Sequence, residues 1–270
     1  MNRNYAFVST CSREGWKEYG EKFVLSFLEH YPVSTRLYMY VDFKTSVKDE
    51  RVIYRDIGEC QGIDRFQGNI QNLYFAQGKK VVLDTHQQAH NPQIIWNARK
   101  FAYKVFSVEH CVLNSREDVI TWVDADTIAF EPIELAFISS LIPPYCMLNY
   151  LGRAGKYTEC GYVSYNKQHP LCRNFVRNFA DLFRSGAIFA LKEWHDSYVF
   201  DLLRYAYEKS CSVINYNISH AEMDHDHVFI NSRLGKYLDH LKGPRKSEGR
   251  SRLSDIKADH GSAYWEAAKA

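Results

Sequence analysis

The stretch Val119-Ile-Thr-Trp-Val123, followed without a break by Asp124-Ala125-Asp126, decides the interpretation of the whole sequence. Five consecutive β-branched or aromatic residues predict a short strand buried on both faces, as in parallel sheets. The two aspartates would then stand at the carboxyl end of that strand, where open α/β sheets bind their ligands. Paired carboxylates repel each other unless a cation accepts their oxygens, so the stretch predicts a site for Mg²⁺ or Mn²⁺.

The sequence before this strand alternates between strand and helix patterns. Apolar residues spaced by three and four predict a helix over 16–31, ended by Pro32, and a second helix is predicted over 94–108. β-rich runs predict three earlier strands, at residues 5–9, 37–41 and 52–54. This order predicts the α/β class, with a mixed, mainly parallel sheet sandwiched by helices.

The sequence after this strand continues the alternation. Strands are predicted at 146–150 and 162–166, on either side of a glycine-containing loop, and a helix is predicted over 171–183. A further helix follows Asp196, with Leu202 among its inward-facing residues.

No segment has the composition of a linker, so we expect a single domain over residues 1–270. Residues 58–92 are rich in Gln and Asn with weak periodicity, and they predict an insertion or flap. From about residue 242 the chain is polar and rich in Lys, Arg and Ser, which predicts a basic C-terminal tail.

Composition excludes several classes of protein. A 46% hydrophobic content in 270 residues excludes general disorder, and a net charge of +2 is too small for a protein-wide field that attracts nucleic acid or membrane. The seven cysteines lack any C-x-x-C pair, so neither a disulfide framework nor a zinc cluster is suggested. The start has no secretion signal and no stretch predicts a transmembrane span, so we expect a cytoplasmic protein.

A second motif lies far along the chain. An Asp-x-Asp pair alone is weak evidence, because Asp224-His-Asp226 forms another one in a polar loop. The segment His240-Leu-Lys-Gly243-Pro-Arg-Lys246 adds an H-x-x-G-x-x-K pattern, in which an imidazole, a glycine and an ammonium recur at fixed offsets.

Together the two motifs resemble those of GT-A fold glycosyltransferases, specifically the retaining, metal-dependent kind typified by glycogenin and lipopolysaccharide galactosyltransferases. The resemblance implies that Asp124, Asp126 and His240 hold Mn²⁺ (or Mg²⁺) on the diphosphate of a sugar nucleotide, with a UDP-sugar as the expected donor. Gly243 and Lys246 would contact the diphosphate, and the Lys246 ammonium would stabilise the leaving group as a catalytic residue.

One departure from this family follows the motif lysine. The family usually has Pro-Trp there, whereas this chain has Ser247-Glu248, so an aromatic contact is missing. The departure bears on assignment to one particular family more than on the fold.

Further residues resemble parts of such a site less specifically. Glu159 and Asp196 are expected beside the donor sugar as catalytic carboxylates, although a surface charge and a helix N-cap explain them equally well. A solvated helix face explains Arg99 and Lys104 nearly as well as donor binding does. The expected donor-binding residues are Ser9, Thr10, Trp16, Arg99, Lys104, Asp124, Ala125, Gly243 and Lys246. The expected acceptor-binding residues are Glu159, Gly161 and His195.

The predicted function is therefore transfer of a hexosyl or pentosyl group from a nucleoside-diphosphate sugar to the hydroxyl of a saccharide or glycolipid. A hydroxymethylated DNA base remains open as an acceptor, because five basic residues could bind a polyanion: Lys242, Arg245, Lys246, Arg250 and Arg252. Two other classes also remain, a nucleotidyltransferase and a nucleic-acid-binding protein without activity. Hydrolysis of a sugar nucleotide would distinguish the three.

Overall fold

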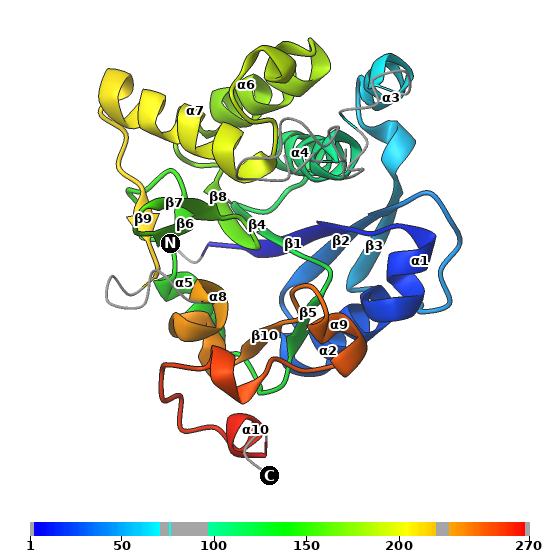
Figure 1. Ribbon diagram of the computed structural model, residues 1–270, viewed down its shortest axis with the longest axis vertical. Helices are drawn as coiled ribbons and strands as arrows, with labels where there is room; N and C mark the ends of the chain where they lie inside the picture. Colours follow the sequence, from blue (N-terminus) through cyan, green and yellow to red (C-terminus); the bar gives the residue numbers. More distant parts are fainter. Residues whose placement is uncertain (1–2, 71–75, 77–96, 220–226, 268–270) are drawn as a thin grey trace, which may run out of the picture.

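The computed structural model describes residues 3–70, 76, 97–219 and 227–267. Its centre is a five-stranded sheet in the order β3-β2-β1-β4-β8 (Figure 1). The first four strands are parallel and β8 is antiparallel to β4. These strands are β1 (Tyr5–Thr10), β2 (Arg36–Val41), β3 (Val52–Asp56), β4 (Val119–Val123) and β8 (Tyr162–Asn166). The predicted mixed, mainly parallel sheet is confirmed.

Strand β4 shows why the deciding stretch has no polar face. Successive side chains of a strand point to opposite faces. Ile120 and Trp122 belong to the hydrophobic core on one side of the sheet, whereas Val119 and Val123 belong to the core on the other side. Both faces of β4 are thus buried, as the sequence predicted.

One face of the sheet is covered by four helices, which lie in the upper half of Figure 1. They are α3 (Ile63–Ile70), α4 (Ala98–Asn114), α6 (Cys172–Arg184) and α7 (Asp196–Cys211). Phe66 of α3 packs between Phe106 of α4 and Phe183 of α6, with ring centroids 6.0 Å apart in each pair. Part of the predicted insertion is therefore a core helix. Residues 71–75 and 77–92 of that insertion lie outside the described residues.

In the described part of the chain, the opposite face is covered by seven further elements, most of them only three to six residues long. They are α1 (Arg13–Gly15), the π-helical turn η1 (Trp16–Gly20), α2 (Glu21–His30), α5 (Leu135–Ser140), α8 (Val228–Asn231), α9 (Arg245–Glu248) and α10 (Ala263–Glu266). Short 3₁₀ turns connect several elements: η2 (Ile57–Glu59), η4 (Ala187–Ala190), η6 (Arg233–Lys236) and η7 (Leu253–Asp255). Within the described ranges, no helix is long and apolar enough to cross a membrane.

A small two-stranded sheet on this face links two distant parts of the chain. β5 (Thr127–Ala129) begins directly after Asp126 and pairs antiparallel with β10 (Leu238–His240). In this ladder His240 lies opposite Thr127. The pairing therefore carries the histidine of the second motif to the aspartates of the first.

The chain beyond β10 folds back on the domain. The Ser251 hydroxyl and the Tyr264 hydroxyl both donate to the buried Asp239 carboxylate, at 2.6 and 2.7 Å. Trp265 is buried, and its indole N–H donates to the carbonyl of Gly235 at 2.7 Å. These contacts anchor the basic segment that follows His240.

A second small sheet lies beside β8 and contains two unpredicted strands, at 156–159 and 216–217. Its strands are β6 (Asn149–Arg153), β7 (Lys156–Glu159) and β9 (Tyr216–Asn217). The Asp201 carboxylate of α7 accepts hydrogen bonds from the Thr158 amide and hydroxyl and pairs with Arg204 at 2.9 Å. Because α7 buries this ion pair, Leu202 is 42% exposed rather than inward-facing.

Candidate active site

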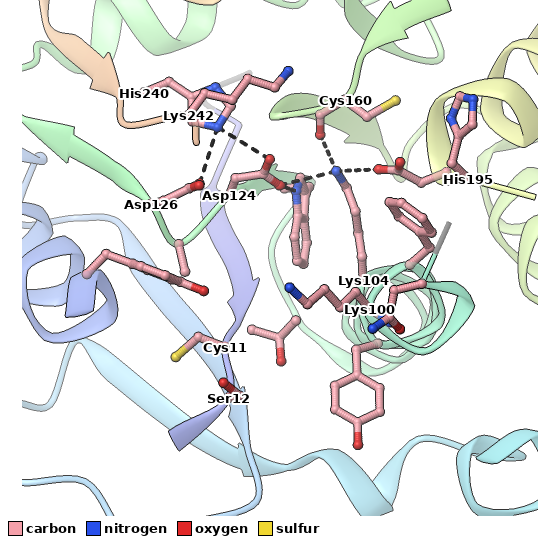
Figure 2. A pocket seen from close by; sticks show the side chains of 18 of the residues that line it. Cys11, Ser12, Lys100, Lys104, Asp124, Asp126, Cys160, His195, His240 and Lys242 are labelled. Carbon is pink, nitrogen blue, oxygen red and sulfur yellow. Dashed lines mark hydrogen bonds and ion pairs between the residues drawn. The ribbon is translucent and has the colours of Figure 1, made fainter. Parts of the chain in front are cut away.

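A cavity of about 1000 Å³ opens at the carboxyl-terminal edge of the parallel strands. Its walls come from the segments that follow β1, β2 and β4, the first turns of α4 and α7, and the loop after β10 (Figure 2). Parallel strands end at one edge, so residues that follow different strands meet there.

Asp124, Asp126 and His240 converge on one side of this cavity. His240 Nε2 lies 3.5 Å from Asp124 Oδ2 and 3.2 Å from Asp126 Oδ1. One ligand atom from each residue lies within 4.8 Å of the others. Two carboxylate oxygens and an imidazole nitrogen are a donor set that Mn²⁺ accepts. The geometry therefore fits a divalent cation held by these three side chains.

The other oxygen of each aspartate is held by a different group. Asp124 Oδ1 accepts from the Trp122 indole N–H at 2.6 Å and from Lys104 Nζ at 3.2 Å. Asp126 Oδ2 pairs with Lys246 Nζ at 2.8 Å. Each carboxylate is thus fixed by one oxygen and offers the other to the centre of the cluster.

All three side chains of the cluster are charged at neutral pH. Burial lowers the pKa of His240, but the Asp126 and Asp124 carboxylates outweigh burial and raise it to about 9. Burial raises the pKa of Asp124, but Lys104 and His240 bring it well below its usual value. The imidazolium therefore compensates the charge of the two carboxylates, and it would lose its proton on binding a divalent cation.

Gly161 makes room for this histidine. A Cβ atom at residue 161 would lie 3.0 Å from His240 Cε1 and 3.3 Å from the Phe229 ring. The sequence predicted Gly161 as an acceptor-binding residue, and in the structure it packs closely against the His240 imidazole.

Gly243 and Lys246 lie on the loop that follows β10. Gly243 adopts a φ of +63°, a left-handed conformation that glycine tolerates without strain, and it lines the cavity. Lys246 lies over the Tyr19 ring, with its ammonium 4.6 Å from the ring centroid. The turn at Gly243 thus returns Lys246 to the aspartate pair.

Glu159 lies at the end of β7 and lines the same cavity. Its carboxylate is ion-paired with Lys242, and Arg153 Nη1 lies 3.5 Å away. Burial raises the pKa of Glu159, but Lys242, His240 and Arg153 outweigh it and lower the pKa to about 2. Glu159 is therefore an ionised carboxylate at neutral pH.

This depressed pKa predicts a pH-dependent effect of Glu159→Gln. Ionised Glu159 stabilises the fold fully above its ordinary pKa of 4.5, and this contribution is lost as pH falls toward 2. We expect Glu159→Gln to lower the free energy of unfolding by about 2 kcal/mol at pH 7. The difference in the free energy of unfolding between Glu159→Gln and the wild type should shrink by about 1 kcal/mol as the pH falls from 4.5 to about 3.5. Urea unfolding at several pH values measures it, and a constant difference would contradict the assignment.

His195 and Asp196 begin α7 at the far side of the cavity. The helix cap is His195, not Asp196: His195 Nδ1 accepts from the Tyr198 amide at 3.2 Å. His195 Nε2 lies 2.7 Å from the Glu193 carboxylate, so protein groups engage both ring nitrogens. Asp196 is buried and pairs with Lys104 at 2.8 Å.

The remaining donor-binding candidates divide into two groups. Thr10, Arg99 and Ala125 line the cavity. Ser9 is fully buried, with its hydroxyl donating to the Val123 carbonyl at 2.6 Å, and Trp16 packs edge-on against aromatic rings of the core. The pairing of β1 with β4 brings the Ser9 hydroxyl to the Val123 carbonyl, and position along the sequence does not reveal this contact between strands.

The sequence did not single out two residues of the site, Trp122 and Arg153. Trp122 orients Asp124, and Arg153 holds Glu159 together with Lys242, which the sequence placed only in the basic segment. For Trp122 a signal existed, because residues two apart in a strand share a face and Trp122 precedes Asp124 by two. For Arg153 none did, because the β6–β7 pairing was not predicted.

The basic segment is largely neutralised by nearby carboxylates. Lys246 pairs with Asp126 and Lys242 with Glu159, as described above. Arg245 pairs with Asp255, and Arg252 with Glu248. The segment thus does not present five free cations to a polyanion. The second Asp-x-Asp pair, at 224 and 226, lies outside the described residues.

No protein-family model matches the sequence, and no curated protein matches it. Among solved structures, mouse xyloside xylosyltransferase 1 in its apo form is 12% identical with a TM-score of 0.43, over 80% of this chain and 85% of that one. The glycosyltransferase GlyE of Streptococcus pneumoniae TIGR4 is 12% identical with a TM-score of 0.42, over 75% of this chain and 43% of that one. The apo form of GlyE is 13% identical with a TM-score of 0.40, over 80% of this chain and 46% of that one. This chain thus spans less than half of GlyE.

Proposed function

We propose that the chain is a metal-dependent glycosyltransferase that uses a nucleoside-diphosphate sugar. The observation that carries the proposal is the convergence of Asp124, Asp126 and His240 on one point of a cavity, with Lys246 2.8 Å from Asp126. Ligand pockets of roughly 300–1,000 Å³ hold molecules of drug size, so this cavity of about 1000 Å³ has room for a sugar nucleotide.

The chemistry of glycosyl transfer requires these side chains. When the bond between sugar C1 and the diphosphate breaks, negative charge develops on the leaving oxygen. A divalent cation bound by Asp124, Asp126 and His240 would supply Lewis-acid stabilisation of that charge. Lys246 supplies a second positive charge from the loop side, and its pairing with Asp126 holds it there until the diphosphate replaces the carboxylate as its partner.

Glu159 and Asp196 supply the carboxylates that face the transferred sugar. Both line the cavity, and both are buried next to cations of the protein. We assign Asp196 to the hydroxyls of the donor sugar and Glu159 to the side where the acceptor enters. The acceptor is the hydroxyl of a saccharide or glycolipid, and the transfer retains the configuration at C1, as the resemblance of the motifs implies.

The experiment that tests the proposal is a screen of sugar nucleotides. The protein is incubated with UDP-, GDP-, ADP- and dTDP-sugars and Mn²⁺, and release of free sugar and nucleoside diphosphate is followed. We expect slow hydrolysis of at least one donor, lost when EDTA replaces Mn²⁺. Absence of hydrolysis with every donor would contradict a glycosyltransferase. Release of pyrophosphate from a nucleoside triphosphate and a sugar phosphate would instead indicate a nucleotidyltransferase.

A further inference from the structure

Lys104 occupies an unusual place for a lysine. Its side chain is only 12% exposed, and the ammonium lies over the Trp122 ring, 4.9 Å from the centroid. Lysine is rarely buried unless an opposite charge compensates it. The contacts of this ammonium therefore indicate what the side chain does.

The ammonium has three acceptors within the protein. Nζ lies 2.8 Å from Asp196 Oδ2 and 3.2 Å from Asp124 Oδ1, and it donates to the Cys160 carbonyl; dashed lines in Figure 2 mark the three contacts. A lysine ammonium has three N–H donors and no acceptor. All its donors are matched, so a bound substrate would gain a hydrogen bond from Lys104 only by breaking one of these.

These contacts join two carboxylates from different elements. Asp124 follows β4 and Asp196 begins α7, and Lys104 on α4 is ion-paired with both. With Asp124 Oδ1 held by Lys104 and Trp122, Oδ2 faces His240. Without the lysine, two carboxylates would remain close together without their shared counter-ion.

Lys100 provides a contrast within the same helix. It lies one turn before Lys104, lines the same cavity and is exposed. Among the described residues no carboxylate pairs with it, whereas Lys104 is paired with two.

We infer that Lys104 is a positioning residue: it ties Asp124 of the proposed metal site to Asp196 and does not bind the donor. The roles of Asp124 and Asp196 in metal and donor binding rest on the proposed function, whereas the three contacts of the Lys104 ammonium are observed in the structure. In this proposal Lys104 does not have the donor-binding role that the sequence leads us to expect.

Lys104→Met tests the inference, with Lys100→Met as the charge-matched control. Both variants remove one positive charge from the cavity, but only the first frees two carboxylates. We expect Lys104→Met to lower the rate of sugar-nucleotide hydrolysis about 100-fold. Its affinity for UDP in the presence of EDTA, measured by calorimetry, should be no weaker than that of Lys100→Met, because without metal the position of Asp124 does not affect UDP binding. An affinity at least tenfold weaker than in the control would show that Lys104 contacts the donor and would overturn the inference.

A double-variant cycle with Asp196→Asn gives a second readout. Residues that act through one contact have non-additive effects, whereas independent residues have additive ones. We expect the losses of Tm in Lys104→Met and Asp196→Asn to be less than additive in the double variant. Full additivity of the Tm losses would refute the coupling. If the wild-type protein hydrolyses no donor, the proposed function fails, and the Tm cycle still tests the contact between Lys104 and Asp196.

Discussion

Asp126→Asn is expected to weaken the Mn²⁺-dependent binding of a nucleoside diphosphate by at least about 100-fold. In the structure Asp126 Oδ1 faces His240 Nε2 at 3.2 Å, and Oδ2 holds Lys246 at 2.8 Å. The amide keeps the size of the side chain but lacks the charge that a divalent cation and the lysine both require. Calorimetric titration with UDP, with and without Mn²⁺, measures the loss.

The fold of the Asp126→Asn protein should survive the change. Removing one carboxylate also removes its repulsion from Asp124, which remains 3.5 Å from His240 as a partner for the imidazolium. Circular dichroism should therefore match that of the wild type. Asp64→Asn, an exposed aspartate on α3, is the matched control and should bind as the wild type does. An unchanged Mn²⁺-dependent affinity in Asp126→Asn would exclude the proposed metal site.

The parts of the fold that the sequence predicted are those with a local signal. β1 to β4 are continuous β-rich runs, and the sheet buries both faces of β4. β7 is four residues long with the sequence Lys-Tyr-Thr-Glu, too short and too polar for a periodicity to show.

Tertiary pairing explains the errors on the helical side. The sequence treats Leu202 as core, but Asp201 and Arg204 pair, and because their opposite charges compensate each other they are buried instead. Phe66 stands among polar residues, and only its neighbours on α4 and α6 make it a core position. Neither effect is visible in a single segment of sequence.

In the candidate site, too, some features have a local sequence signal and others depend on tertiary pairing. Asp124 and Asp126 follow a recognisable strand, so their place at the sheet edge could be predicted. The place of His240 depends on the β5–β10 ladder, a pairing between residues more than a hundred positions apart. The H-x-x-G-x-x-K motif identified the histidine as a candidate ligand, but its position beside the aspartates follows only from the β5–β10 pairing.

Lys246→Met is expected to reduce kcat for sugar-nucleotide hydrolysis by about 100- to 1,000-fold, with a much smaller change in KM. The reason lies in the two partners available to this ammonium. In the structure the ammonium pairs with Asp126 and lies over the Tyr19 ring. When the donor binds, the ammonium exchanges the Asp126 carboxylate for the diphosphate, so it adds little to donor affinity.

Lys246 contributes its stabilisation as charge develops on the leaving diphosphate, because a preorganised cation stabilises the transition state more than the ground state. Lys246→Arg should restore part of kcat, since it keeps the charge but changes its geometry. Lys22→Met, at an exposed position on α2, is the control and should leave both constants unchanged. Steady-state kinetics separates the outcomes: a raised KM with an unchanged kcat would make Lys246 a donor-binding residue without a part in catalysis.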